Sequence, residues 1–330
     1  MFIFRDKTQI IDIGGSQLTA FFESLLHQAL LWTGKPYAPG GLPQRLLASA
    51  FLSDDAGLLL WSDLTRAPNY YQTEAEAELI QEKADELSSR IEDGTIIMDL
   101  GCGDIRKTIP LLQALEKQKK FVSYYAIDLS RKSLENGLRR FESDYHHIQC
   151  TGLWGTWDAG LAWSKQMLDA RRSRLYLSLG SIFGNDHLEP AIARLRGWAQ
   201  EALCGSTNSS MLLTMDATTD KDLLHASYNE NDGLYERFIR NGFRHTNRIL
   251  GRTGTRTRTG SADNPVMHRS VLRAKRRVRV HAVGLVLDEG TELDCYENFK
   301  YGPTVMHDQF AAAGLHCIEQ WKAPKANICK

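Results

Sequence analysis

The segment Met98-Asp-Leu-Gly-Cys-Gly-Asp-Ile-Arg-Lys-Thr108 places two glycines between an apolar run and a stretch of helical periodicity. The apolar run, residues 95–100, has the composition of a buried strand, and residues 108–119 carry apolar side chains at helical spacing. Glycine at the turn lets the backbone bend sharply and approach a ligand with no Cβ in the way. The segment therefore predicts a strand, a glycine turn and a helix at the carboxyl edge of a parallel sheet, where nucleotide-like ligands bind.

Strands and helices alternate on both sides of this segment. Apolar or β-branched runs predict strands at residues 95–100, 121–127, 174–179, 210–215 and 278–287. Apolar side chains at helical spacing predict helices at residues 18–32, 73–91, 108–119, 131–141 and 187–203. This alternation is typical of an α/β fold with parallel strands. Thr73 and Glu76 have the spacing of a capping box, which assigns Glu76 to the start of the helix at 73–91.

An acidic residue ends the strand that follows the glycine turn. Asp128 lies about 20 residues beyond the glycines, where the ribose-binding acid of such folds is expected, and its carboxylate can accept bonds from both ribose hydroxyls. A solvated aspartate after a chance strand is the plainer alternative. Gly101 and Gly103 lack the third glycine of the dinucleotide fingerprint, which disfavours a nicotinamide cofactor. The combination of turn and acid predicts a bound adenosyl group.

A second glycine-containing segment, Ser178-Leu-Gly-Ser-Ile-Phe-Gly-Asn185, follows the strand at 174–179. Its glycines and terminal amide can form a cavity wall, in which the Asn185 carbonyl would orient an amine without adding charge. An ordinary strand-to-helix turn capped by Asn185 or Asp186 explains the same residues. Both interpretations stay open on the pattern alone.

Composition narrows the class of protein. The 330 residues are 42% hydrophobic and 24% charged, as in ordinary globular proteins, and the formal net charge is zero. Zero charge argues against broad attraction to nucleic acid or an anionic membrane, and no apolar run is long enough to span a bilayer. The six cysteines include no Cys-x-x-Cys pair and the ten histidines are unclustered, so we expect neither disulfides nor a metal site. A cytoplasmic protein is the expectation.

The quoted segments resemble a known enzyme family, the histidine-specific N-methyltransferases of ergothioneine synthesis, whose fungal branch includes 4-dimethylallyltryptophan N-methyltransferase. Residues Arg106-Lys-Thr108 are much more specific to that family than a Gly-x-Gly pair. The similarity runs over residues 10–251 and 278–321. Its main stretches are residues 63–73, 100–108, 124–130, 179–185 and 226–229.

The resemblance implies an S-adenosylmethionine (SAM)-dependent N-methyltransferase. Its fold would be α/β, a Rossmann-like sheet with a smaller, discontinuous substrate-binding domain. We expect the SAM-binding domain to comprise residues 74–214 and 301–330, and the substrate-binding domain residues 1–73 and 215–300. The partner would be a small-molecule amine, and methyl transfer requires no metal, nucleic acid or membrane.

The resemblance also assigns roles to individual residues. The cofactor would be held by Gly101, Gly103, Lys107, Asp128 and Asp158, with Asp158 near the adenine. The amine would be oriented by the catalytic residues Tyr71, Asn185 and Tyr228, and the substrate-binding set also includes Tyr70, Tyr296 and Asn298. Only the resemblance gives Lys107 a role, since a lysine in the first turn of a helix is ordinarily a solvated residue.

One departure from the family pattern bears on the acceptor. The histidine enzymes carry Glu and Ser where this chain has Tyr296 and Asn298, and those two groups recognise the imidazole. An aromatic residue at Tyr296 instead suits a flat apolar or aromatic side chain. We therefore expect an aromatic or alkaloid-like amine of secondary metabolism as the acceptor, with histidine α-N-methylation as the alternative.

A second departure is the segment at residues 252–277, which is rich in Arg, Thr and Gly and almost without apolar periodicity. Such a stretch buries little surface, so we expect a mobile loop, and a shifted reading frame would also explain the abrupt change. An RNA-binding basic arm is a further alternative, and loss of part of the substrate domain would leave an inactive relative. The family's final apolar strand also has no counterpart in residues 321–330.

Overall fold

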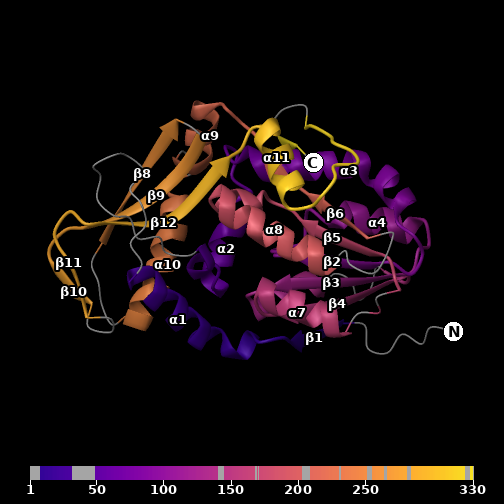
Figure 1. The fold of residues 1–330 in the computed structure, drawn as a ribbon, viewed down its shortest axis with the longest axis horizontal. Helices are drawn as coiled ribbons and strands as arrows, with labels where there is room; N and C mark the ends of the chain where they lie inside the picture. Colours follow the sequence, from indigo (N-terminus) through magenta and orange to yellow (C-terminus); the bar gives the residue numbers. More distant parts are fainter. Residues whose placement is uncertain are drawn as a thin grey trace. The chain divides into compact units, whose positions relative to one another are not determined.

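The computed structural model describes residues 8–31, 49–139, 145–167, 169, 171–202, 209–229, 232–250, 255–263, 266–280, 284–323 and 328–329. The chain divides into two compact units (Figure 1). Unit 1 comprises residues 1–16, 70–219 and 300–330, and unit 2 comprises residues 17–69 and 220–299.

Unit 1 is built on a parallel sheet with the strand order β1-β4-β3-β2-β5-β6. Its strands are β1 (Thr8–Asp12), β2 (Ile96–Leu100), β3 (Val122–Asp128), β4 (Ile148–Trp154), β5 (Arg174–Ser178) and β6 (Ser210–Leu213). All five residues of β2 are buried, as expected of a strand in a parallel sheet that is covered on both faces. The α/β class predicted from the sequence is confirmed. The residues that follow β2, β3 and β5 meet at the carboxyl edge of this sheet.

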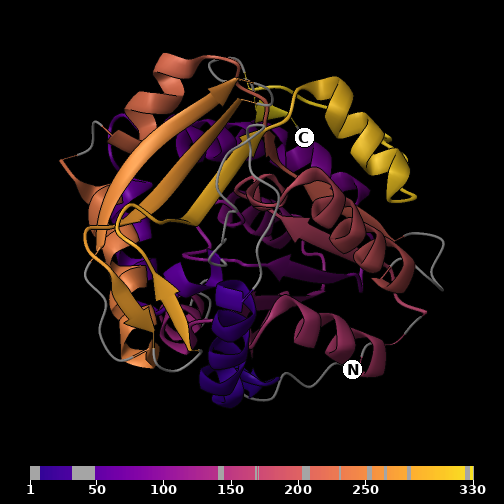
Figure 2. The same ribbon diagram turned by 60° about the vertical axis from the view of Figure 1, so that its left-hand side comes forward.

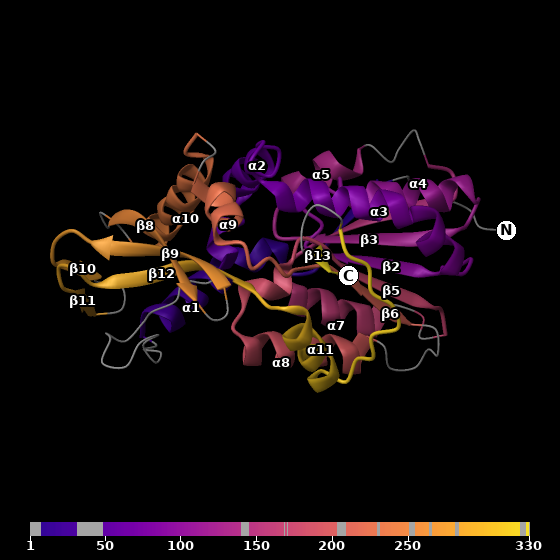
Figure 3. The ribbon, with the colours of Figure 1, turned by 90° about the horizontal axis from the view of Figure 1, so that it is seen from above.

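Helices cover both faces of this sheet (Figure 3). One face carries α3 (Tyr71–Arg90), α4 (Ile109–Lys117) and α5 (Arg131–Leu138), and the other carries α7 (Trp157–Met167), α8 (Leu188–Ala202) and α11 (Pro303–Ala312). Successive residues of β2 contribute to opposite cores. Ile97 packs in the cluster that contains Leu111 of α4, whereas Met98 packs in the cluster that contains Trp198 of α8. Packing on both faces holds β2 in place, and with it the carboxyl edge of the sheet where the candidate site lies.

Strand β1 brings N-terminal residues into unit 1. It pairs in parallel with β4, from Thr8 beside Cys150 to Asp12 beside Trp154. The predicted substrate-binding domain, residues 1–73 and 215–300, therefore differs from unit 2 at residues 1–16, 70–73, 215–219 and 300, which belong to unit 1. The largest difference is the N-terminal segment. The cause is β1 itself, whose five residues were too short a run to be recognised as a strand.

Unit 2 combines helices with a small antiparallel sheet (Figure 2). Its helices are α1 (Leu18–Leu31), α2 (Asp55–Leu64), α9 (Lys221–Asn229) and α10 (Leu234–Leu250). Its sheet has the order β12-β9-β8, formed by β8 (Thr255–Asp263), β9 (Val266–Ala274) and β12 (Glu292–Lys300). Among the described residues of both units, no helix has the length and apolar character needed to cross a membrane.

Three sequence predictions need correction in the C-terminal part of the chain. The prediction of a mobile loop is wrong for residues 255–263 and 266–274. Strands β8 and β9 pair along their whole length, from Thr255 beside Ala274 to Asp263 beside Val266. The single strand at 278–287 is a hairpin of β10 (Val278–Val280) and β11 (Leu285–Leu287). The chain also ends with a short strand, β13 (Ile328–Cys329), which pairs with β7 (Met215–Asp216).

Candidate functional site

The glycine turn after β2 adopts a backbone conformation that ordinary residues disfavour. Gly101 has a φ of 70° and Gly103 a φ of 57°, both in the left-handed region. A Cβ added at Gly101 would lie 3.2 Å from Ile182 and 3.4 Å from Trp157, whereas one added at Gly103 would meet nothing within 4 Å. Gly101 is thus required for close packing, and Gly103 exposes its backbone to open space at the sheet edge.

Asp128 ends β3 beside this turn and is bound to it. Its Oδ2 accepts the backbone N–H of Gly103 at 3.0 Å, and its Oδ1 accepts that of Ser130 at 3.0 Å. The side chain is buried, and burial raises the pKa of Asp128 to about 6. Each carboxylate oxygen has a second lone pair, so the group can accept two further hydrogen bonds from a diol. A carboxylate that accepts hydrogen bonds at this position fits the hydroxyl donors of the ribose in an adenosyl cofactor.

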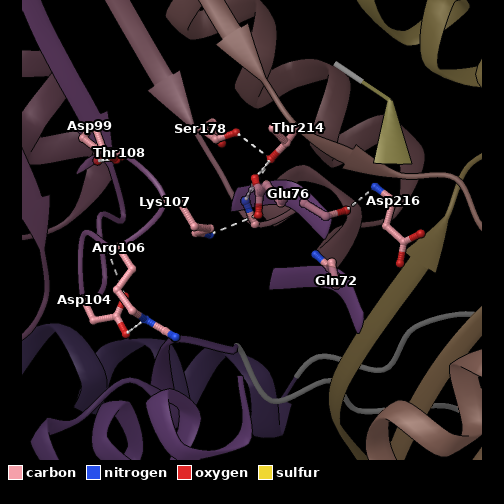
Figure 4. Close-up of polar contacts among 12 residues, drawn as sticks. Gln72, Glu76, Asp99, Asp104, Arg106, Lys107, Thr108, Ser178, Thr214 and Asp216 are labelled. Carbon is pink, nitrogen blue, oxygen red and sulfur yellow. Dashed lines mark hydrogen bonds and ion pairs between the residues drawn. The ribbon is translucent and has the colours of Figure 1, made fainter. Parts of the chain in front are cut away.

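Lys107, at the end of the same loop, faces a buried acid of α3 (Figure 4). Lys107 Nζ lies 3.4 Å from Oε2 of Glu76, whose side chain is 1% exposed. The other oxygen, Oε1, accepts the N–H of Gly180 at 2.7 Å and the hydroxyl of Thr214. The capping role predicted for Glu76 is wrong, because α3 begins at Tyr71 and Glu76 lies on the buried side of the helix.

A second buried acid anchors the loop to β2. Asp99 Oδ2 accepts the hydroxyl of Thr108 at 2.6 Å and that of Tyr124 at 2.8 Å. Burial raises the pKa of Asp99, while these two hydrogen bonds oppose that shift. The segment between Gly101 and Thr108 is therefore held at both ends, by its glycine turn and by Asp99. This anchoring fixes the base of the loop that carries Lys107.

Tyr71, in the first turn of α3, belongs to a network that the sequence did not indicate. Its hydroxyl donates to Asp216 Oδ2, and the same oxygen forms an ion pair with Lys300 Nζ at 2.6 Å. The side chains of Lys300 and Asp216 are both fully buried. Burial, followed by the charge of Asp216, raises the pKa of Tyr71 above its usual range. Because Tyr71 donates its proton to Asp216, it faces other groups as a hydrogen-bond acceptor.

The remaining predicted residues of unit 1 lie on neighbouring elements. Asp158 is exposed in the first turn of α7, directly after β4. Asn185 is half-buried at the end of the 3-10 helix Ile182–Asn185, which follows β5. Tyr70 is buried and is the N-cap residue of α3. Cofactor and acceptor candidates thus gather around the carboxyl edge of the sheet, while their roles stay predictions.

Three predicted substrate residues belong to unit 2, where they are buried among aromatic rings. Tyr228 of α9 stacks on His268 of β9 at 4.0 Å between ring centroids. Tyr296 and Asn298 of β12 share a hydrogen bond of 3.3 Å from the Asn298 amide to the Tyr296 hydroxyl. Tyr235 lies between the two sets, 4.9 Å from Tyr228 and 6.3 Å from Tyr296 between ring centroids. Tyr235 was missed, because its sequence context carries no motif.

The other missed residues are charged groups inside the fold. Glu76 could have been found as an acid among the buried positions of α3, next to Ala75 and Leu79. No local signal could have found the pair of Asp216 and Lys300, which are far apart in the sequence and meet only in the folded chain.

Comparisons with known proteins bear on the family of the chain. The model of a family described as histidine-specific, SAM-dependent methyltransferases matches residues 38–330. The chain is 34% identical to the N-methyltransferase dtpB of Aspergillus flavus over 216 residues, or 64% of this chain and 59% of that protein. It is 36% identical to ergothioneine biosynthesis protein 1 of Neurospora crassa over 209 residues, or 63% of this chain and 23% of that protein.

A third relative matches over almost its whole length. The 4-dimethylallyltryptophan N-methyltransferase easF of Arthroderma benhamiae is 28% identical over an alignment of 337 positions, gaps included, which covers 97% of this chain and 95% of that protein. The matches to dtpB and to the Neurospora protein, in contrast, span less than two thirds of those proteins.

Proposed function

This chain belongs to the family of histidine-specific, SAM-dependent methyltransferases, and we propose on that premise that it methylates the amino nitrogen of a small aromatic or alkaloid-like amine. The observation that carries the proposal is the sheet edge of unit 1. There the glycine turn and Lys107 follow β2, the Asp128 carboxylate ends the adjacent strand β3, and Glu76 of α3 faces Lys107. These groups suit an adenosyl ligand with a charged tail.

The residues of the edge would bind and align the reactants. Bound SAM supplies a methyl group on a sulfonium, which an amine attacks in line. Gly103 would offer backbone close to the cofactor, Asp128 would accept hydrogen bonds from the ribose, and Asp158 would lie near the adenine. Lys107 belongs to the same cofactor set. Methyl transfer of this kind depends mainly on alignment and exclusion of water, which can contribute on the order of 7–11 kcal/mol.

The amine must react as its free base, so its N–H groups need acceptors. Tyr71 is such an acceptor, because its own proton is donated to Asp216. The carbonyl oxygen of Asn185 would act in the same way, and Tyr228 would complete the catalytic set. Acceptors on the N–H groups leave the nitrogen lone pair directed at the methyl group. Partial burial of the amine lowers its pKa and favours the free base.

Aromatic rings around Tyr296 support an aromatic acceptor. The Tyr296 ring centroid lies 6.3 Å from that of Trp61 and 6.5 Å from that of Phe238. The Arthroderma relative is a 4-dimethylallyltryptophan N-methyltransferase, whose acceptor is also an aromatic amino acid derivative. The partner is thus proposed to be a small-molecule amine of secondary metabolism. The unpaired cysteines Cys102, Cys150 and Cys295 support a cytoplasmic location.

Histidine is the second candidate, because the family is described as histidine-specific and one relative is an ergothioneine biosynthesis protein. A competition assay separates the two. Histidine and a set of tryptophan-derived amines are offered together with SAM, and the methylated products are quantified by mass spectrometry.

We expect kcat/KM to favour the aromatic amine by about 5- to 150-fold, the equivalent of roughly 1–3 kcal/mol for an imidazole N–H left unpaired. Trimethylation of histidine with the higher kcat/KM would overturn the aromatic assignment. A reaction without the chain gives the background, and the Asp128→Ala variant, which removes the acceptor for the ribose hydroxyls, should lower the rate for every substrate.

A further inference from the structure

We propose that Glu76 and Lys107 together recognise the zwitterionic amino-acid end of the cofactor, with Glu76 binding its ammonium and Lys107 its carboxylate. The inference rests on the proposed function and extends it to a residue, Glu76, that was predicted only as a helix cap.

The first ground is the state of the Glu76 carboxylate. Oε1 is saturated by the Gly180 N–H and the Thr214 hydroxyl. Oε2 is fully buried and, within the described part of the chain, accepts no hydrogen bond. A buried carboxylate oxygen without a donor is costly unless a ligand supplies one. Oε2 therefore has capacity for a cationic donor.

The second ground is the state of the Lys107 ammonium. Nζ lies 3.4 Å from Glu76 Oε2, beyond the usual 2.7–3.2 Å range of N–H···O bonds. A Cβ added at Gly180 would come within 2.6 Å of Nζ, so the glycine makes room for the lysine. The ammonium carries three donors, and Lys107 is 19% exposed, which leaves it accessible to an anionic group.

The third ground is the neutrality of the pair. A ligand with a negative charge alone would be repelled by Glu76, and a ligand with a positive charge alone would be repelled by Lys107. An α-amino acid group carries both charges one carbon apart, so it satisfies both residues together. The pair thus fits a zwitterion better than a phosphate or a simple amine.

Two molecules of the reaction can carry such a group, the cofactor and an amino acid acceptor. The structure favours the cofactor. Lys107 shares its loop with Gly103, and Gly103 donates to the proposed ribose acceptor Asp128. Asp128 ends β3, the loop follows β2, and Gly180 follows β5, which are adjacent strands. One extended ligand along this edge meets Asp128 first and the charged pair next.

The test is calorimetric binding, which does not depend on turnover. The probes are S-adenosylhomocysteine, its decarboxylated form, its deaminated form and 5′-methylthioadenosine, which lacks the whole amino-acid end. The variants are Glu76→Gln and Lys107→Met. The matched control is Glu116→Gln, which neutralises a carboxylate of α4 that contacts His147. Circular dichroism checks that each variant is folded.

We expect Glu76→Gln to weaken S-adenosylhomocysteine and the decarboxylated probe by about tenfold or more, because both carry the ammonium. Lys107→Met should weaken S-adenosylhomocysteine and the deaminated probe in the same way. Neither variant should change the affinity for methylthioadenosine. If Glu76→Gln does not fold, Lys107→Met still tests the carboxylate half, because Lys107 is the more exposed of the two.

Wild-type affinity for S-adenosylhomocysteine in both folded variants would overturn the inference and leave the proposed function intact. If both variants keep that affinity but raise the KM for an amino acid acceptor, the pair of Glu76 and Lys107 binds the acceptor instead of the cofactor. An equal loss for all four probes would mean a purely structural role and would also overturn it. Failure of the wild-type chain to bind any probe would refute the proposed function itself.

Discussion

Asp128 shows how one residue can couple cofactor binding to pH. Its carboxylate is buried at the end of β3, and burial raises its pKa to about 6 in spite of the opposing N–H bonds from Ser130 and Gly103. The ribose hydroxyls would donate to the charged form and would therefore favour ionisation. Protonation removes part of this acceptor capacity, so the site is expected to weaken in acid.

The first prediction follows from that pKa. Affinity for S-adenosylhomocysteine should be constant above about pH 7 and fall by up to roughly tenfold per unit below pH 6, as Asp128 takes up a proton. Asp128→Asn should bind about tenfold or more weakly at pH 8 and lose this pH dependence. Calorimetry between pH 5 and 8 measures both effects. Parallel pH curves for the two proteins would contradict the role of Asp128.

Sequence patterns could predict those residues whose meaning is local. Gly101 and Gly103 follow an apolar run, and Asp128 ends the next one, so spacing alone indicated their common edge. Glu76 was misread because its spacing to Thr73 imitates a capping box. Its position among the buried residues of α3 was the better signal, since a buried acid needs partners from elsewhere in the fold.

At the scale of elements, the buried ion pair between Asp216 and Lys300 joins β7 to β12, and we expect that breaking it destabilises the fold. Lys300→Met should lower the free energy of unfolding by about 3–5 kcal/mol, because it leaves the Asp216 charge buried without its cation. Adding Asp216→Asn should recover part of the loss, since no net charge then remains. Thermal and denaturant unfolding measure the three proteins. Equal stability of the single variant and the wild type would contradict the pair's role.

The antiparallel strands β8 and β9 are the element that sequence reasoning failed to predict. Residues 255–259 alternate Thr and Arg with the period of a strand, and Thr is β-branched, but this polar alternation has no apolar periodicity that would indicate a buried face. In β9, Met267 and Val271 are buried. The apolar residues described as buried in this strand pair thus lie in β9, outside the Thr and Arg alternation.

A substitution in β9 tests whether this strand belongs to the folded unit. Val271→Asp should lower stability by several kcal/mol, because it buries an unpaired carboxylate. The matched control, Arg273→Asp, introduces the same side chain at an exposed position of the same strand. Limited proteolysis should cut residues 266–274 in the Val271 variant and spare them in the control. Equal cleavage of the two would favour the mobile loop.

At the scale of the whole molecule, the α/β class and four of the six strands of the central sheet (β2, β3, β5 and β6) could be predicted from alternating patterns, but β1, β4 and the exact make-up of the units could not. Unit 1 takes segments from three parts of the chain, and the N-terminal one joins it through the pairing of β1 with β4. Pairing between distant segments leaves no local pattern.

Tracing the methyl group tests the central claim, that this chain is an N-methyltransferase for an aromatic amine. The purified chain is incubated with SAM carrying a deuterated methyl group and the tryptophan-derived amines, and fragment masses locate the label. We predict label on the amino nitrogen of an aromatic amine, and less of it with Asp128→Ala at a SAM concentration below the KM. Label confined to histidine, or to a carbon or oxygen atom of any acceptor, would contradict the account.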